Sequence, residues 1–255
     1  MKTLAGKTLF ITGASRGIGR AIALRAAQDG ANVVIAAKTA EAHPKLSGTI
    51  HTVADEVRKA GGKALAIQLD VRDENAIIEA VKRGAQEFGG IDILVNNAGG
   101  SRNFGKDATE EQWNEALTLN FTRHRQLAHR LLPAMAEKKW GRVINITGKM
   151  EPDNVNGAFC AKAALTAWAK GLSREVGKQG ITVNCIAPGR IMSDQIRRNY
   201  TPEYRAWQSE HEIPVGRYGE PEELADLAVF LASPRGAYIS GIVYFVDGGL
   251  RRYQY

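Results

Sequence analysis

Three glycines near the start of the chain follow a short apolar run and precede a helical pattern. The run Leu9–Thr12 leads into Gly13, Gly17 and Gly19. Glycines at this spacing permit a tight turn and let the backbone approach a pyrophosphate, and free N–H groups at the start of the next helix can hold the anion. The sequence therefore predicts a dinucleotide site, with a purely structural turn as the alternative. The residues that we expect to contact the dinucleotide here are Gly13, Ser15, Arg16, Gly17, Ile18 and Gly19.

The second apolar run is followed by a cation rather than by a carboxylate. Val33–Ala36 leads into Ala37, Lys38 and Thr39. A site for NAD(H) places a carboxylate at this point to accept a hydrogen bond from the ribose 2′-hydroxyl, whereas a 2′-phosphate needs cations. Arg16 in the glycine turn can reach the same phosphate. We therefore expect the cofactor NADP(H), held here by Arg16, Lys38 and Thr39, and the alternative is that both cations are only solvated.

Short apolar runs alternate with longer helical patterns along the whole chain. The runs are mostly apolar, as is typical of strands buried on both faces of a parallel sheet. The expected fold class is therefore α/β, a single-domain Rossmann fold over residues 1–255 with a doubly wound parallel sheet of about seven strands. The expected strands are 9–12, 33–36, 64–69, 91–95, 143–146, 181–186 and 242–246, and the expected helices include 20–28, 74–88 and 161–178.

Two helix starts carry capping signals. Thr109 is followed three residues later by Gln112, which predicts a capping box for a long helix that contains Asn120. Pro221 stands among glutamates in the first turn of another helical pattern, where proline and carboxylates both favour a helix start.

Composition excludes several classes of protein. A chain of 255 residues with 44% hydrophobic and 24% charged residues suits one globular core. Its net charge of +7 is scattered over helices, so we expect no nucleic-acid partner. No signal-peptide pattern and no apolar stretch of about 18 to 20 residues is present, so we expect no membrane association. Cys160 and Cys185 lack the spacing of a disulfide framework or a metal site, so we expect no metal and a cytoplasmic location.

The order of several short motifs resembles that of the short-chain dehydrogenase/reductase family. Besides the glycine turn, the motifs are Asp70-Val71, Asn96-Asn97-Ala98-Gly99, Pro188-Gly189 and Val246-Asp247-Gly248-Gly249. Together they span nearly the whole chain. The first third is especially similar to the hydroxysteroid-dehydrogenase-like branch of that family, and this likeness fades after Asn97.

The resemblance implies positions for the rest of the cofactor site. Asp70 and Val71 are expected to flank the adenine. Asn97, Ala98 and Gly99 are expected to line the cofactor path. Pro188 and Gly189 follow a strand, and Ile191 and Ser193 are expected to lie against the nicotinamide. The resemblance also implies a homo-oligomer, either a dimer or a tetramer.

The family's reaction implies an acid/base group that is missing here. In the family a tyrosine exchanges a proton with the carbonyl oxygen, and a lysine four residues later lowers the pKa of that tyrosine and holds the ribose. Lys162 matches the lysine, and Asn120 matches the asparagine that supports it through a water. Ala158 stands at the tyrosine position, and Gly148 falls nearest to the family's serine. Thr147 is the expected substitute for the serine hydroxyl, so the expected catalytic residues are Lys162, Asn120 and Thr147.

Other residues of the chain could replace the tyrosine. Lys149 and Glu151 lie on the loop expected over the site, where surface charge is the competing interpretation. Packing within a lid is the competing interpretation for Tyr200, Tyr204 and His211. We expect Cys160 to be a buried helix residue rather than a nucleophile. Arg102 and Arg190 could bind a carboxylate or the phosphate of a thioester carrier, or could be solvated.

Three functions remain open from the sequence. The first is an NADP(H)-dependent oxidoreductase with an altered acid/base system that acts on a carbonyl or on a conjugated enone or enoyl substrate. The second is a non-redox lyase or isomerase on the same fold. The third is a catalytically silent NADP(H)-binding protein. We expect a small-molecule substrate whose identity the sequence does not reveal.

Overall fold

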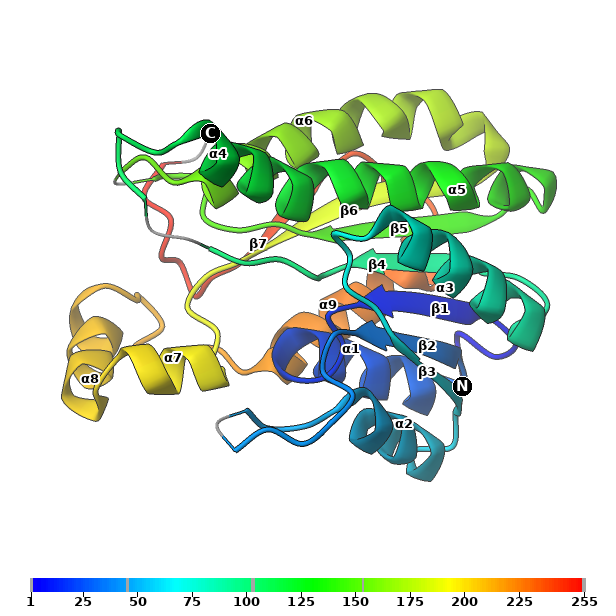
Figure 1. Ribbon diagram of the computed structural model, residues 1–255, viewed down its shortest axis with the longest axis horizontal. Coiled ribbons are helices and arrows are strands. Elements are labelled where there is room, and N and C mark those ends of the chain that lie inside the picture. Colours follow the sequence, from blue (N-terminus) through cyan, green and yellow to red (C-terminus); the bar gives the residue numbers. More distant parts are fainter. Residues whose placement is uncertain (1, 45, 102–103, 153, 254–255) are drawn as a thin grey trace.

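Seven parallel strands form one sheet in the order β3-β2-β1-β4-β5-β6-β7 (Figure 1). The computed structural model describes residues 2–44, 46–101, 104–152 and 154–253. The sheet order reverses between β1 and β4, and ligands of doubly wound folds bind beyond the carboxyl ends of strands at such a point. The strands are β1 (Thr8–Thr12), β2 (Asn32–Ala37), β3 (Lys63–Gln68), β4 (Ile93–Asn96), β5 (Gly141–Ile146), β6 (Ile181–Pro188) and β7 (Val243–Val246).

Helices cover both faces of the sheet, which explains why the strand sequences are mostly apolar (Figure 1). In β1, Leu9 and Ile11 belong to one hydrophobic core, whereas Phe10 belongs to the other. The first core includes α1 (Gly17–Gln28), α2 (Ile50–Lys59) and α9 (Pro221–Ala232), and the second includes α3 (Glu74–Phe88), α5 (Arg123–Glu137) and α6 (Gly157–Val176). The predicted fold class, a doubly wound parallel sheet of about seven strands, is confirmed.

The predicted long helix contains a π-helical segment at its functional position. α4 (Glu110–Leu117) is followed by the π segment η1 (Thr118–Thr122) and then directly by α5. The predicted capping box is confirmed, because Thr109 Oγ1 accepts from Gln112 N at 3.4 Å and Gln112 Oε1 accepts from Thr109 N at 2.9 Å. A π segment inside an α-helix commonly marks a functional site, and this one contains Asn120.

Two further segments surround the carboxyl ends of the last strands. After β6 the chain forms α7 (Asp194–Asn199) and α8 (Pro202–His211), which stand apart from the two helical layers (Figure 1). After β7 the C-terminal tail, residues 247–253, crosses the same region. The remaining short helices are η2 (Gly177–Gln179) and η3 (Pro234–Gly236). Within the described ranges, no helix has the length and apolar character needed to cross a membrane, and no cluster of His, Cys, Asp and Glu could hold a metal ion.

Candidate active site

The backbone of the glycine turn is accessible to a ligand. A Cβ added at Gly19 would lie 2.4 Å from the Gly13 carbonyl oxygen and 2.6 Å from Asn97 Nδ2, so this position requires glycine. Gly17, with φ of +54°, begins α1, and a Cβ there would meet nothing within 4 Å. Arg16, the residue before α1, makes no side-chain capping bond to the first turn. The first-turn N–H groups and the open space at Gly17 therefore fit the pyrophosphate of a dinucleotide.

Asn97 holds this turn against the end of β4. Its Nδ2 donates to the carbonyl oxygens of Thr12 and Gly13, each at 3.0 Å. In return, Thr12 Oγ1 accepts from the N–H groups of Asn97 and Ala98, also at 3.0 Å. The Asn97 side chain therefore fixes the glycine turn against the end of β4.

Arg16 and Thr39 meet at the carboxyl end of β2, as the charge argument predicted. Arg16 Nη2 donates to Thr39 Oγ1 at 3.0 Å and to the Gly48 carbonyl at 3.3 Å, and Nε donates to the Ser47 carbonyl at 2.9 Å. Partial burial lowers the pKa of Arg16, and Asp194 opposes that shift. The Arg16 guanidinium therefore lies over the end of β2.

Lys38 points to the neighbouring strand end, where Asp70 lies. Lys38 Nζ is 3.5 Å from Asp70 Oδ2, and its side chain is 61% exposed. Asp70 also accepts from the Arg72 guanidinium at 2.7 Å, and mainly this hydrogen bond lowers the pKa of Asp70 to about 2. Val71, predicted beside the adenine, is buried. Lys38 is therefore exposed enough to turn toward an anionic ligand.

Lys162 of α6 reaches the carboxyl end of β5. Its Nζ donates to the Ile146 carbonyl oxygen at 2.7 Å. A Cβ added at Gly99 would lie 3.4 Å from the same Nζ, and one added at Gly148 would lie 3.5 Å from Lys162 Cδ. Burial lowers the pKa of Lys162 to about 8. The ammonium is thus held between the ends of β4 and β5 and can lose its proton near neutral pH.

Asn120 lies on the other side of Gly99. The side chain is fully buried, and its Nδ2 donates to the carbonyl oxygens of Gly100 at 3.1 Å and Ala116 at 3.0 Å. Its Oδ1 accepts from Gly100 N at 3.2 Å. A Cβ at Gly99 would lie only 2.9 Å from that Oδ1. Asn120 therefore fixes the loop that passes beside Lys162, and the structure brings these two predicted residues together around Gly99.

The position of Thr147 requires a correction. Thr147 is 3% exposed, its hydroxyl donates to the Ile186 carbonyl at 3.2 Å, and its N–H donates to the same oxygen at 2.8 Å. The hydroxyl therefore joins β5 to β6 instead of facing a ligand. The next residue, Gly148, lines the neighbouring cavity.

The start of α6 presents a phenyl ring to that cavity. Ala158 is 3% exposed, whereas the adjacent Phe159 lines the cavity. No hydroxyl is therefore available from these two residues at the position where the family resemblance places a tyrosine.

A buried polar cluster beside Lys162 was missed by sequence reasoning. His124 is 1% exposed, Nε2 lies 2.7 Å from the Ala98 carbonyl oxygen, and Nδ1 has no hydrogen-bond partner among the described residues. Burial, followed by the charge of Lys162, lowers the pKa of His124 to about 3, so the ring is neutral. Asn96 Nδ2 donates to Asn145 Oδ1 at 2.9 Å and to the His124 carbonyl at 3.3 Å. The spacing of His124 four residues after Asn120 is the signal that could have revealed it.

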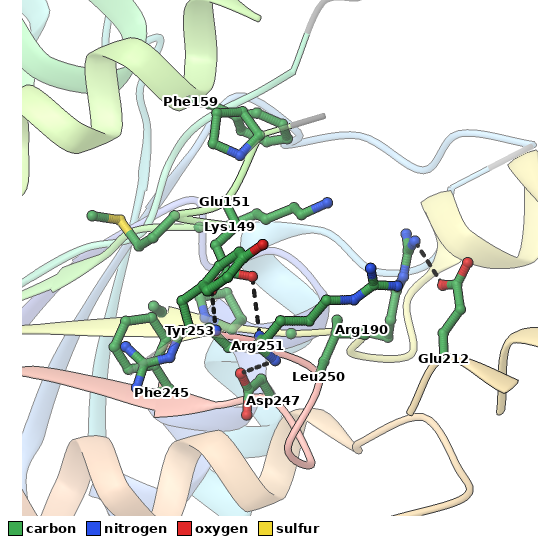
Figure 2. Close-up of a pocket in the computed structure, with 17 residues that line it drawn as sticks. Lys149, Glu151, Phe159, Arg190, Glu212, Phe245, Asp247, Leu250, Arg251 and Tyr253 are labelled. Atoms are coloured by element: carbon green, nitrogen blue, oxygen red, sulfur yellow. Dashed lines mark hydrogen bonds and ion pairs between the residues drawn. The ribbon is translucent and has the colours of Figure 1, made fainter. Parts of the chain in front are cut away.

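A cavity of about 670 Å³ opens at the carboxyl ends of β5, β6 and β7. Its walls come from the loop after β5, from Pro188 and Gly189 at the end of β6, and from the C-terminal tail. Figure 2 shows the tail lying across Glu151. Glu151 accepts from the N–H groups of Arg252 at 3.1 Å and Tyr253 at 2.9 Å. Gly148 lines this cavity, and a Cβ added there would lie 3.5 Å from Lys162 Cδ, so the cavity lies next to the predicted reaction centre.

Some of the other predicted residues line this cavity, and the rest lie in the segment after β6 or at the glycine turn. Lys149, Glu151 and Arg190 line the cavity. Ser193 Oγ accepts from Ile196 N at 3.2 Å and caps α7, while Ile191 is buried and pairs with Gly219. Ser15 is buried within the glycine turn and Ile18 is half-buried in α1.

The aromatic side chains of residues 200–211, the segment around α8, stack on one another. Tyr200, Tyr204, Trp207 and His211 form a continuous row, with Tyr204 and Trp207 well exposed. This row fits the interpretation of packing within the segment, and Arg190, which lines the cavity, lies 6.0 Å from the centre of the Tyr200 ring. Cys160 is exposed, contrary to the expectation of a buried helix residue, because it faces away from the sheet on α6. Arg102 lies outside the described residues.

Comparison with known proteins places this geometry in a family. A family model described as Enoyl-(Acyl carrier protein) reductase matches residues 13–251. The chain is 37% identical over 251 residues to 3-oxoacyl-[acyl-carrier-protein] reductase FabG of Vibrio cholerae serotype O1, a match that covers 97% of this chain and 98% of that protein. This chain belongs to the short-chain dehydrogenase/reductase family.

Two further relatives agree with this assignment. Hydroxysteroid dehydrogenase-like protein 2 of Xenopus tropicalis is 47% identical over 194 residues, covering 72% of this chain and 46% of that protein, so this chain spans less than half of that relative's length. The structure of 7α-hydroxysteroid dehydrogenase complexed with NADH and 7-oxo glycochenodeoxycholic acid is 33% identical with a TM-score of 0.89, covering 97% of this chain and 95% of that one. The predicted resemblance to this family is confirmed.

Short-chain dehydrogenase/reductases bind nicotinamide cofactors, and this chain has the cradle for one. The glycine turn would hold the pyrophosphate at the open space beside Gly17, while Gly13 and Gly19 pack too closely against the protein for a Cβ. Lys162 and Asn120, two of the predicted catalytic residues, both lie beside Gly99.

Proposed function

We propose that this chain is an NADP(H)-dependent oxidoreductase with an altered acid/base system, acting on a carbonyl or on a carbon–carbon double bond conjugated to one. Family membership supports redox chemistry on a small molecule. The open glycine turn and the absence of a carboxylate in Ala37-Lys38-Thr39 support the cofactor.

The proposed cofactor would be held along the carboxyl ends of β1, β2 and β4. The first-turn N–H groups of α1 would bind the pyrophosphate. Arg16, Lys38 and Thr39 would bind the 2′-phosphate, since a guanidinium and an ammonium form charge-assisted hydrogen bonds with phosphate oxygens. When bound, the nicotinamide supplies or accepts a hydride, and the residues of the chain supply binding, orientation and protons.

The observation that carries this proposal is the position of Lys162. Its ammonium is anchored by the Ile146 carbonyl, stands beside Gly99 and Gly148, and has a pKa lowered to about 8 by burial. A general acid works best when its pKa lies near the working pH. We therefore assign to Lys162 Nζ the electrostatic stabilisation of a developing oxyanion and the supply of its proton.

Reduction of a conjugated substrate would need the least proton transfer from the side chains of this site. When a double bond conjugated to a carbonyl is reduced, negative charge collects on the carbonyl oxygen, where a fixed ammonium stabilises it. The proton then needed at the neighbouring carbon can come from solvent. A saturated ketone instead forms a more basic alkoxide that would depend on proton transfer from Lys162 alone, because neither Ala158 nor the buried Thr147 hydroxyl provides a second acid.

The experiment is a screen of NADPH oxidation with saturated ketones, conjugated enones and enoyl thioesters. We expect turnover of at least one conjugated substrate to exceed that of its saturated counterpart by about tenfold or more. The Lys162→Met variant should lose that turnover. If no carbonyl or conjugated substrate supports NADPH oxidation above the Lys162→Met background, the proposal is wrong.

Location and assembly belong to the same proposal. We propose a cytoplasmic homodimer or homotetramer, and the two free cysteines, exposed Cys160 and buried Cys185, are compatible with a reducing compartment. Light scattering of the purified chain tests the assembly, and a monomeric mass would contradict it.

A further inference from the structure

The cavity beside Lys162 has aromatic walls and cationic groups supplied largely by the C-terminal tail. Phe159, Phe245 and Tyr253 contribute rings. Among the described lining residues, the cations are Lys149, Arg190, Arg251 and Arg252, and the carboxylates are Glu151, Glu212 and Asp247. The lining therefore combines apolar surface with an excess of one positive charge.

Two of the three carboxylates are satisfied by backbone groups of the tail. Glu151 accepts from the N–H groups of Arg252 and Tyr253. Asp247 accepts from the N–H groups of Gly249 at 3.0 Å and Arg251 at 3.2 Å. These carboxylates hold the tail in place (Figure 2). These hydrogen bonds use neutral amides and not the guanidinium groups of the tail, while the charges of Arg251 and Lys149 act on Glu151 and help to lower its pKa.

The third carboxylate is paired with a cation. Glu212 Oε2 accepts from Arg190 Nη2 at 3.2 Å and from Gln208 Nε2 at 2.9 Å. Figure 2 shows Arg190 and Glu212 together at one side of the cavity. Arg190 is therefore engaged by a carboxylate, and the tail contributes two further cations, Arg251 and Arg252, to the wall.

Arg251 is oriented for an anion. Its guanidinium carbon lies 3.7 Å from the centre of the Phe245 ring, which covers one face of the guanidinium. Its backbone N–H is held by Asp247. A guanidinium whose face is covered by an aromatic ring still presents its N–H edge, which matches a carboxylate in a bidentate arrangement. The fixed backbone and the covered face reduce the conformational freedom lost on binding.

We infer that the substrate of this cavity carries a carboxylate attached to an apolar or aromatic body, and that Arg251, assisted by Lys149, binds that carboxylate. The inference rests on the proposed function, because it names the class of substrate for the same site. The aromatic walls would receive the body of the molecule, and the carboxylate would lie against the tail.

The test measures binding, so it does not depend on turnover. The probes are trans-cinnamate and trans-cinnamamide, which have nearly the same shape but differ in charge. Their affinities are measured by ligand-observed NMR and by calorimetry, both with and without NADPH. We expect the wild-type chain to bind cinnamate about tenfold or more tightly than cinnamamide in at least one of these states.

Two matched variants identify the group responsible. Arg251→Gln should abolish the preference for cinnamate. Arg235→Gln is the control, because Arg235 also lies over an aromatic ring, that of Phe230 at 5.2 Å, but does not line the cavity. It should retain the preference. Thermal unfolding of both variants checks that they are folded, and hydrogen exchange of the tail checks that Arg251→Gln leaves it in place.

Several outcomes would overturn the inference. Equal affinity for the two probes in both states would do so, as would undetectable binding of both or a preference that survives in Arg251→Gln. Displacement of cinnamate by 3′,5′-ADP would assign the cations to the phosphate of a thioester carrier instead. The substrate screen tests the proposed function separately. If it shows NADPH oxidation while the binding experiment gives any of these results, only this inference fails.

Discussion

Lys162 Nζ donates a hydrogen bond of 2.7 Å to the carbonyl oxygen of Ile146, which joins the second turn of α6 to the last residue of β5. This bond fixes the ammonium at the carboxyl edge of the sheet without neutralising it. A carbonyl partner stabilises the charged form less than a carboxylate would, so burial prevails and the pKa falls to about 8.

The first prediction concerns the pH dependence of reduction. Because Lys162 must be protonated to act as an acid, the rate should be level below about pH 8 and fall about tenfold per pH unit above it. Lys162→Met should lower kcat by about a hundredfold or more. Lys170→Met, an exposed lysine on the same helix, is the control and should change little. A wild-type profile that stays level to pH 9.5 would contradict the assigned role.

The second prediction restores a phenol to α6. Ala158→Tyr places a hydroxyl four residues before Lys162, on the same helix face. Reduction of saturated ketones should rise about a hundredfold relative to Ala158→Phe, which adds the same bulk without the hydroxyl. Both variants should lose about 1–3 kcal/mol of stability, because position 158 is buried. Equal ketone reduction by the two variants would show that the hydroxyl is not what this site lacks.

The third prediction concerns His124 and acid stability. The folded pKa of about 3 lies below that of an unfolded histidine, so the unfolded chain binds the extra proton first as the pH falls. The contribution of the neutral ring to the free energy of unfolding should be full above about pH 6.5. It should decrease as the pH falls from about 6.5 toward about 3, and about 2 kcal/mol should be lost at pH 5.

Chemical denaturation at pH 7 and pH 5 checks this prediction. The loss of stability between these pH values should be about 2 kcal/mol smaller in His124→Gln than in the wild type. The exposed His129 on the same helix provides the control variant His129→Gln, which should behave like the wild type. An unchanged loss in His124→Gln would mean that the buried ring is not the source of acid sensitivity.

The sequence was sufficient for the features that depend on local pattern. The glycine turn, the strand runs and the Thr109 capping box each involve residues close together in the chain, so spacing alone determines them. The meeting of Arg16 with Thr39 was also predictable, because the carboxyl ends of β1 and β2 are neighbours in this fold.

The features that the sequence did not reveal depend on contacts between distant segments. Glu151 binds the N–H groups of residues about a hundred positions later, and nothing in either segment signals the other. Thr147 was expected to face the ligand, but its hydroxyl bonds to β6 because the strand register brings Ile186 beside it. The π segment at Asn120 has no local signature in the capping and periodicity patterns used to find helices.

The fourth prediction tests the close packing of the glycine turn. Gly19→Ala should cost about 2 kcal/mol or more, because the new methyl group would lie 2.4 Å from the Gly13 carbonyl oxygen. Gly171→Ala, in an exposed position of α6 with nothing within 4 Å of an added Cβ, should instead stabilise the chain by about 0.5–1 kcal/mol. Thermal and denaturant unfolding measure both, and a neutral Gly19→Ala would contradict the described turn.

The central claim is a functional NADP(H) site, and the most direct measurement is a fluorescence titration of the four tryptophans with NADPH and with NADH. Charge-assisted hydrogen bonds contribute about 1.5–3 kcal/mol each, so NADPH should bind about tenfold or more tightly than NADH. Lys38→Ala and Arg16→Ala should each weaken binding of NADPH more than that of NADH, whereas the exposed Lys59→Ala on α2 should change neither. Equal affinity for the two nucleotides, or no binding of either, would contradict the account.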